Sequence, residues 1–220
     1  SIGLISNFSF YYAHHMSTIE GGMVSTNDEN YYQILRMLRS HGMVREATNG
    51  ELKNDFLKNS NELNPDFIFA YRGFNVRNTE IGAVLGRTQL KRLDRNIELR
   101  TKNLLTFLEC LDPEKFRTDF LTKGSSNYAL NIVMKDKDFD MRDRIETLLS
   151  DNEIEFRRGS AGGGNQLRQP YLKNIIKIKN FKNFKNVERV HFFGYYIGNY
   201  PELKKEKILK ITNLFNSLDI

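Results

Sequence analysis

Two adjacent histidines, His14 and His15, follow a short apolar stretch and precede a pair of glycines. Histidine readily takes up and releases a proton near neutral pH, so His14 is a candidate acid–base catalyst, with a purely structural role as its alternative. Two histidines could also bind a metal ion, but no Asp or Glu stands at ligand spacing, and no metal site is predicted. Ser9, five residues earlier, is by itself an ordinary serine at the end of a predicted strand.

Further polar residues stand in the middle and at the end of the chain. Asn75 lies in a glycine-containing turn, where it could contact a ligand or satisfy its own backbone. Arg157 and Arg168 carry planar guanidinium groups that could bind a carboxylate or a diphosphate in bidentate fashion. They flank a glycine-rich run at residues 159–164, which lacks a nucleotide-binding fingerprint and is predicted to be a mobile active-site loop.

Four segments resemble, in the right order, the motifs of the DegT family of vitamin B6-dependent sugar aminotransferases. The first spans residues 9–22 and reads Ser-Phe, then His14, then Glu-Gly-Gly, with the histidine in place of the family's lysine. The others are the Arg-x-His-Gly loop around His41, the turn around Asn75 with the helix start after it, and residues 159–170, which are similar to a run typical of the family's 3-dehydratases. The resemblance covers nearly the whole chain.

The resemblance implies a fold, a cofactor and a reaction. The expected fold is the C-terminal part of a fold type I aminotransferase, an α/β protein with part of the large domain and a small α+β domain. Because imidazole cannot form the lysine's covalent bond to the cofactor, pyridoxal or pyridoxamine 5'-phosphate would be held non-covalently, with His14 as the proton-transferring base. Ser9 and Asn75 would contact the cofactor phosphate, and His41, Glu155, Arg157 and Arg168 are candidates for the substrate.

The branch of the family that carries a histidine in place of the lysine removes the C3 hydroxyl of nucleotide-linked 4-keto-6-deoxy sugars, with glutamate as amino donor. The chain has one cysteine, Cys110, and none in residues 43–61, where the CDP-sugar branch holds ligands of an iron–sulfur cluster. No cluster is therefore expected, and the GDP-sugar type, acting on GDP-4-keto-6-deoxymannose, fits better. The resemblance also implies a homodimer in which Asn75 serves the neighbouring active site.

Two alternatives remain open beside the enzyme. The family's upstream cofactor-binding segments have no counterpart before Ser1, so the chain could be an inactive fragment or a pseudoenzyme. Thirty-three basic and 27 acidic residues give a net charge of +6, with lysines concentrated in residues 173–185. This excess could mark a nucleic-acid-binding module, but a solvated amphipathic segment is the preferred interpretation.

Composition and hydrophobic pattern predict the elements that position these residues. At 40% hydrophobic residues the chain should form a core, and the absence of a long apolar run favours a cytoplasmic protein without a membrane span. Two short strands flank the His14 loop, a helix begins after Asp28, residues 47–64 form a surface loop, and a long helix spans 79–111 with Cys110 buried. Strands at 128–134 and 154–158, with helices at 141–149 and 202–218, complete the small domain. The predicted domains are residues 1–110, including the linking helix, and 111–220.

Overall fold

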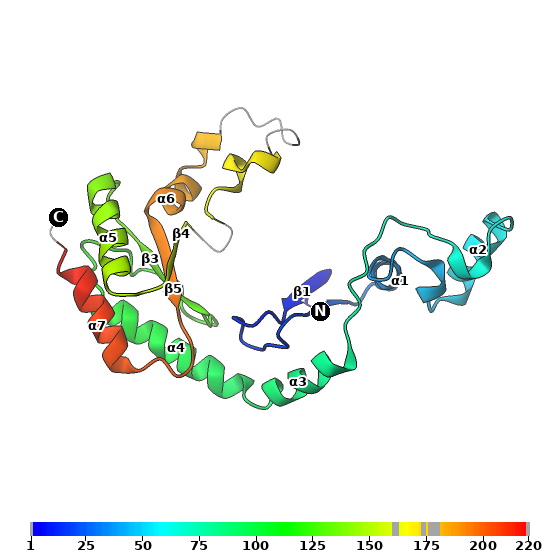
Figure 1. The fold of residues 1–220 in the computed structure, drawn as a ribbon, viewed down its shortest axis with the longest axis horizontal. Coiled ribbons are helices and arrows are strands. Elements are labelled where there is room, and N and C mark those ends of the chain that lie inside the picture. The colour runs from blue at the N-terminus through cyan, green and yellow to red at the C-terminus, as the bar shows by residue number, and fades with distance from the viewer. Residues whose placement is uncertain (1, 160–162, 173–174, 176–180, 219–220) are drawn as a thin grey trace. The chain divides into compact units, whose positions relative to one another are not determined.

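The computed structural model describes residues 2–159, 163–172, 175 and 181–218 (Figure 1). The chain divides into two compact units, residues 1–93 and 94–220. Each unit has its own buried apolar residues. The sequence analysis ended the first domain at residue 110. In the structure the helix that begins at Leu93 already packs into the core of the second unit.

The first unit opens with an antiparallel hairpin. Strands β1 (Ile5–Ser9) and β2 (Gly22–Thr26) pair with Ser9 opposite Gly22, so the predicted strands on either side of the His14 loop are confirmed. Helix α1 (Glu29–Leu38) follows at once. The Asp28 side chain accepts a hydrogen bond from the Tyr31 N–H (3.0 Å), which is the predicted N-cap.

Residues 47–64 contain a helix, α2 (Gly50–Asn59), where the sequence analysis predicted a loop. Its start is capped by Asn49, whose side-chain oxygen accepts from the Leu52 N–H (3.0 Å). None of its residues is fully buried, and only Leu52, Phe56 and Leu57 carry large apolar side chains, so the segment shows no sustained hydrophobic period. The Asn49 cap satisfies one of the backbone N–H groups at its start.

The long helix predicted over residues 79–111 is two helices. Helix α3 (Glu80–Leu90) ends in a turn in which the Arg92 N–H donates to the Gln89 carbonyl (3.0 Å), and α4 (Leu93–Cys110) follows. The apolar spacing continues across this turn, so periodicity could not reveal the break. Cys110, at the end of α4, is half-buried, whereas the sequence analysis predicted a buried thiol.

The second unit is a three-stranded antiparallel sheet packed on helices. Its strand order is β3 (Ala129–Val133), β5 (Gly194–Gly198), β4 (Phe156–Arg158), with β5 in the centre. Helices α4, α5 (Phe139–Asp151) and α7 (Lys205–Asn216) supply the core residues that pack on the sheet, among them Phe107, Ile145 and Phe215. The predicted strand–helix–strand unit and the final helix are confirmed.

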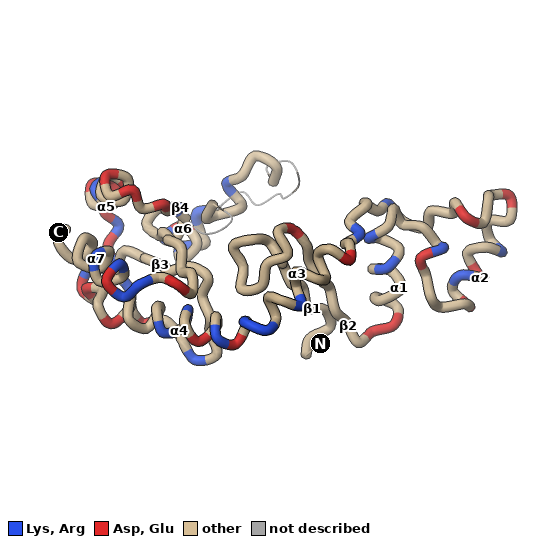
Figure 2. The backbone as a smooth tube through the Cα atoms, turned by 60° about the horizontal axis from the view of Figure 1, so that its bottom comes forward, with Lys and Arg blue, Asp and Glu red and all other residues tan. Residues whose placement is uncertain are grey.

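Helix α6 (Lys185–Phe193) and strand β5 were not predicted. The sequence of β5, Gly-Tyr-Tyr-Ile-Gly, is short and apolar on both sides, so it shows no clean alternation. Figure 2 shows acidic and basic residues interspersed along α4 and α5. Much of the lysine-rich segment 173–185 lies outside the described residues, as do Ser160–Gly162 of the glycine-rich run.

Candidate functional site

The loop that carries His14 is closed at its base by backbone hydrogen bonds. The Phe10 N–H donates to the Gly21 carbonyl (2.9 Å), and the Thr18 N–H donates to the Phe10 carbonyl (2.9 Å). Inside the loop, the His14 N–H donates to the Tyr11 carbonyl (3.0 Å), and the two rings meet edge to face with centroids 6.0 Å apart. His14 is half-buried. Its imidazole is therefore held in a defined turn.

Ser9 lies at the entrance of the same loop, as the last residue of β1. Its side chain is exposed, and its hydroxyl oxygen is 3.4 Å from the Tyr11 N–H, a weak contact. Ser9 thus ends the strand that leads into the His14 loop. An exposed hydroxyl beside a turn of backbone N–H groups suits contact with an anion such as a phosphate.

Small residues let helix α3 approach this loop closely. A methyl group added at Gly86 of α3 would lie 3.4 Å from the Thr18 methyl, and one added at Gly21 of the loop would lie 3.2 Å from the side-chain nitrogen of Asn78, which lies just before α3. Thr18 is buried and donates to the Glu20 carbonyl (2.7 Å). Thr18 and Asn78 therefore position the His14 loop. Sequence reasoning did not identify either residue, because their role depends on contacts with α3.

His41 and Asn75 lie on two segments that run side by side. The His41 N–H donates to the Phe74 carbonyl (2.9 Å), and Ser40 and Asn75 form an isolated antiparallel bridge. Both candidate side chains are exposed, and the Asn75 oxygen accepts from Arg77 Nε (3.1 Å). The structure thus joins the Arg-x-His-Gly loop to the Asn75 turn, although 34 positions separate the two residues in the sequence.

Glu155 and Arg157 lie at strand β4 of the second unit, and both are exposed. Their neighbour Arg158 forms an ion pair with Glu146 of α5 (3.0 Å). Glu146 also accepts from the Tyr195 hydroxyl (3.2 Å). Successive side chains of a strand point to opposite faces. Arg158 therefore lies on the face toward α5, and Glu155 and Arg157 lie on the other face.

Arg168 forms a bidentate ion pair within the chain. Its Nε and Nη2 atoms donate to the two carboxylate oxygens of Glu188 (2.8 and 2.5 Å), and its guanidinium lies 4.8 Å from the Phe192 ring centroid. Asn165 donates to the same carboxylate (2.6 Å), and its N–H donates to His191 Nδ1 (3.1 Å). This network ties the segment after the glycine-rich run to α6. Glu188 and His191 were not predicted, because no motif covers α6.

The Arg168 and Asn165 hydrogen bonds lower the pKa of Glu188 to about 2. A carboxylate whose pKa is lower in the folded state stabilises that state fully above its unfolded pKa of about 4.3, and the contribution is lost as pH falls toward 2. We expect Glu188→Gln to destabilise the protein at pH 7, with the difference from wild type shrinking between about pH 4.5 and pH 2. Urea denaturation of both proteins across this range measures it. A difference that stays constant with pH would contradict this assignment.

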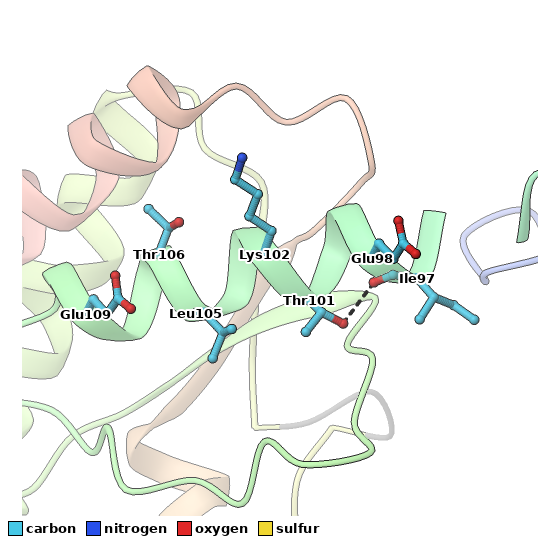
Figure 3. A pocket seen from close by; sticks show the side chains of 7 residues that line it. All are labelled: Ile97, Glu98, Thr101, Lys102, Leu105, Thr106 and Glu109. Atoms are coloured by element: carbon cyan, nitrogen blue, oxygen red, sulfur yellow. Dashed lines mark hydrogen bonds between the residues drawn. The ribbon is translucent and has the colours of Figure 1, made fainter. Parts of the chain in front are cut away.

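The candidates fall into two groups. Ser9, His14, His41 and Asn75 belong to the first unit, and Glu155, Arg157 and Arg168 belong to the second. A shallow depression on α4 contains none of these residues (Figure 3). In the parts of the chain that the structure describes, no three His, Cys, Asp or Glu side chains cluster as metal ligands would. No helix there is both long and apolar enough to cross a membrane.

The chain has clear relatives of known structure. It is 30% identical over 206 residues to GDP-4-keto-6-deoxy-D-mannose 3-dehydratase from Escherichia coli O55:H7, a match that covers 91% of this chain and 51% of the relative. The enzyme of the same name from Yersinia pseudotuberculosis is 30% identical over 223 residues, covering 98% of this chain and 54% of the relative. The chain spans about half the length of these proteins.

Solved structures of the same enzyme also resemble this chain. An Escherichia coli GDP-4-keto-6-deoxy-D-mannose 3-dehydratase with bound hydrated PLP superposes with a TM-score of 0.73 at 28% identity, over 98% of this chain and 55% of that one. A variant of this dehydratase with bound GDP-perosamine gives a TM-score of 0.75 at 28% identity, with the same coverage. The chain has the fold of about half of a PLP-dependent aminotransferase, as predicted. Residues 1–216 match the DegT/DnrJ/EryC1/StrS aminotransferase family, and the chain belongs to that family.

Proposed function

We propose that the protein carrying this chain is a 3-dehydratase that depends on pyridoxal or pyridoxamine 5'-phosphate and acts on a nucleotide-linked 4-keto-6-deoxy sugar. The proposal rests on His14, which lies inside a hydrogen-bonded hairpin loop and which the motif resemblance aligns with the family's lysine. The relatives named as GDP-4-keto-6-deoxy-D-mannose 3-dehydratases support GDP-4-keto-6-deoxymannose as the substrate.

The residues present fit a cofactor that is not covalently bound. Residues 9–22 contain no lysine, so this loop offers no amine that could bond to the cofactor aldehyde. Ser9 presents an exposed hydroxyl at the mouth of the loop, and the exposed amide of Asn75 is a second candidate for the phosphate. When bound, the cofactor would supply the carbonyl that receives the amino group of glutamate and the ring that accepts electrons from the reacting carbons.

His14 would move a proton at the cofactor carbon that carries the amine. A half-buried imidazole can do this because it can exchange protons and the loop hydrogen bonds restrict its position. The sugar would lose its C3 hydroxyl as water, and hydrolysis at C4 would release ammonia. The reaction balances as glutamate plus the 4-keto-6-deoxy sugar giving 2-oxoglutarate, ammonia and the 3-deoxy sugar.

The remaining candidates would bind the substrates. Arg157 and Arg168 would contact a diphosphate or the carboxylate of glutamate, for which the planar guanidinium is suited, and Glu155 and His41 would contact hydroxyls. Arg168 would have to exchange or share its bidentate contact with Glu188 to do so. A homodimer is part of the proposal, with Asn75 reaching the neighbouring active site.

The test follows the two half-reactions separately. Addition of glutamate to the protein with pyridoxal phosphate should convert the absorbance of the aldehyde form to that of the amine form and produce 2-oxoglutarate. Subsequent GDP-4-keto-6-deoxymannose should release one ammonia per 3-deoxy product. A transamination product that keeps nitrogen on the sugar would contradict the proposal, and a protein that binds no cofactor would be the pseudoenzyme.

A further inference from the structure

Two backbone hydrogen bonds of different chemistry hold the glycine-rich run at its two ends. At its start, the Gly159 N–H donates to the Gly194 carbonyl of β5 (2.7 Å). Just after its end, the Asn165 N–H donates to Nδ1 of His191 on α6 (3.1 Å). A carbonyl oxygen does not titrate near neutral pH, whereas an imidazole nitrogen does. Of these two hydrogen bonds, the second can therefore respond to pH.

The contact between Asn165 and His191 is close and shielded from solvent. Asn165 is only 1% exposed, so water has little access to its N–H. A methyl added at Gly164 would overlap the His191 imidazole and lie 2.8 Å from its Cα, so the chain reaches the ring because a glycine precedes Asn165. A buried N–H that loses its acceptor is costly, and the contact therefore depends on the acceptor at His191.

An imidazole nitrogen that accepts a hydrogen bond carries no proton of its own. With Nδ1 as the acceptor, neutral His191 holds its proton on Nε2, so a second proton enters at Nδ1. The imidazolium would then point an N–H at the Asn165 N–H, and the hydrogen bond between the two residues would be lost. Protonation of His191 and the closed position of Asn165 therefore exclude each other.

Charged groups around this contact keep their charge while His191 titrates. Glu188, one turn earlier on α6, attracts an imidazolium at His191, and its own pKa is lowered to about 2 by the Arg168 and Asn165 hydrogen bonds. The Arg168–Glu188 ion pair therefore stays intact across the range of about pH 5 to 8 in which histidines titrate. The other charged side chains of α6 and of its neighbours β4 and the start of α5 are Lys185, Arg189, Arg157, Arg158, Asp140 and Arg142.

We propose that His191 is a pH-sensitive latch for the C-terminal end of the glycine-rich run. Neutral His191 holds Asn165 against α6, and protonated His191 releases residues 163–165 from that helix. Gly159 keeps its hydrogen bond to β5, and Arg168 keeps its ion pair with Glu188, so the release is confined to one end of the run. This release requires neither cofactor nor sugar, and it is independent of the proposed dehydratase function.

Amide hydrogen exchange of the whole protein from about pH 8 to pH 5 tests the latch. Gly159 is the internal control, because its N–H closes the other end of the same run on a carbonyl that does not titrate. The protection of the Asn165 amide relative to the Gly159 amide should fall by about tenfold as the pH is lowered. A ratio of the two protection factors that stays constant with pH overturns the proposal.

Two substitutions separate the titration of His191 from its packing. His191→Asn offers a carbonyl oxygen near the place of Nδ1 but does not titrate, so Asn165 should stay protected at every pH. His191→Phe keeps a ring without an acceptor, so Asn165 should exchange rapidly throughout. Circular dichroism and thermal melting at pH 8 show whether each variant folds, and if His191→Phe does not, wild type and His191→Asn decide. A protection ratio in His191→Asn that falls with pH as in wild type also overturns the proposal.

Discussion

Replacing His14 by asparagine is expected to slow sugar dehydration by about 10²- to 10⁴-fold, the usual loss when a positioned acid–base group is removed. Asparagine is close in size and polar, so the hairpin loop, which is held by backbone hydrogen bonds, should keep its shape. Cofactor binding should persist, because Ser9 and Asn75 are unchanged. Steady-state kinetics with GDP-4-keto-6-deoxymannose and cofactor absorbance measure the two effects.

Two further variants sharpen this prediction. His14→Lys restores the amine of the aminotransferases, so the cofactor should become covalently attached and dehydration should be abolished. His15→Asn is the matched control, since it changes the neighbouring imidazole in the same half-buried loop and should leave most of the activity. Full dehydratase activity in His14→Lys would disprove the role of His14 as the base.

Replacing Gly42 by alanine is expected to destabilise the first unit by at least about 3 kcal/mol, because strain and steric overlap both contribute. Gly42 has φ of +79°, which costs a residue with a side chain about 1–2 kcal/mol. The added methyl would also lie 1.9 Å from the Tyr71 carbonyl oxygen, closer than any real contact. Because backbone must move, the junction between His41 and the Asn75 turn should open, and activity should fall with stability.

Gly124→Ala provides the matched control for this substitution. Gly124 has φ of +74°, nearly the same as Gly42, but an added methyl there meets nothing within 4 Å. It should therefore show only the conformational cost of about 1–2 kcal/mol. Urea denaturation of both variants measures the difference. Equal destabilisation in the two would mean that the contact with Tyr71 relaxes at little cost.

Local signals in the sequence predicted much of the scaffold around the candidate site. Asp28 marked the start of α1, because an N-cap needs only the residues that follow it. Alternation marked β3, and apolar periodicity marked α5 and α7. Helix α2 was not predicted, because its segment is mostly polar and shows no sustained hydrophobic period.

Local patterns in the sequence could not predict the contacts between distant segments. Strand β5 is central to its sheet because two other strands pair with it, a fact that its five residues do not encode by themselves. Arg168 could be recognised as an anion-binding group, but its pairing with Glu188, 20 positions away, depends on where α6 lies.

The proposed type of chemistry comes from the sequence alone. In the motif that residues 9–22 resemble, His14 stands where the family has its lysine, and an imidazole cannot form the covalent bond to the cofactor but can still transfer a proton. The tertiary structure decided which groups surround the His14 loop and the other candidate residues. Packing set the contact of Thr18 with α3, the contact of Asn78 with Gly21 and the Arg168–Glu188 pair. These depend on segments that approach one another only when the chain folds.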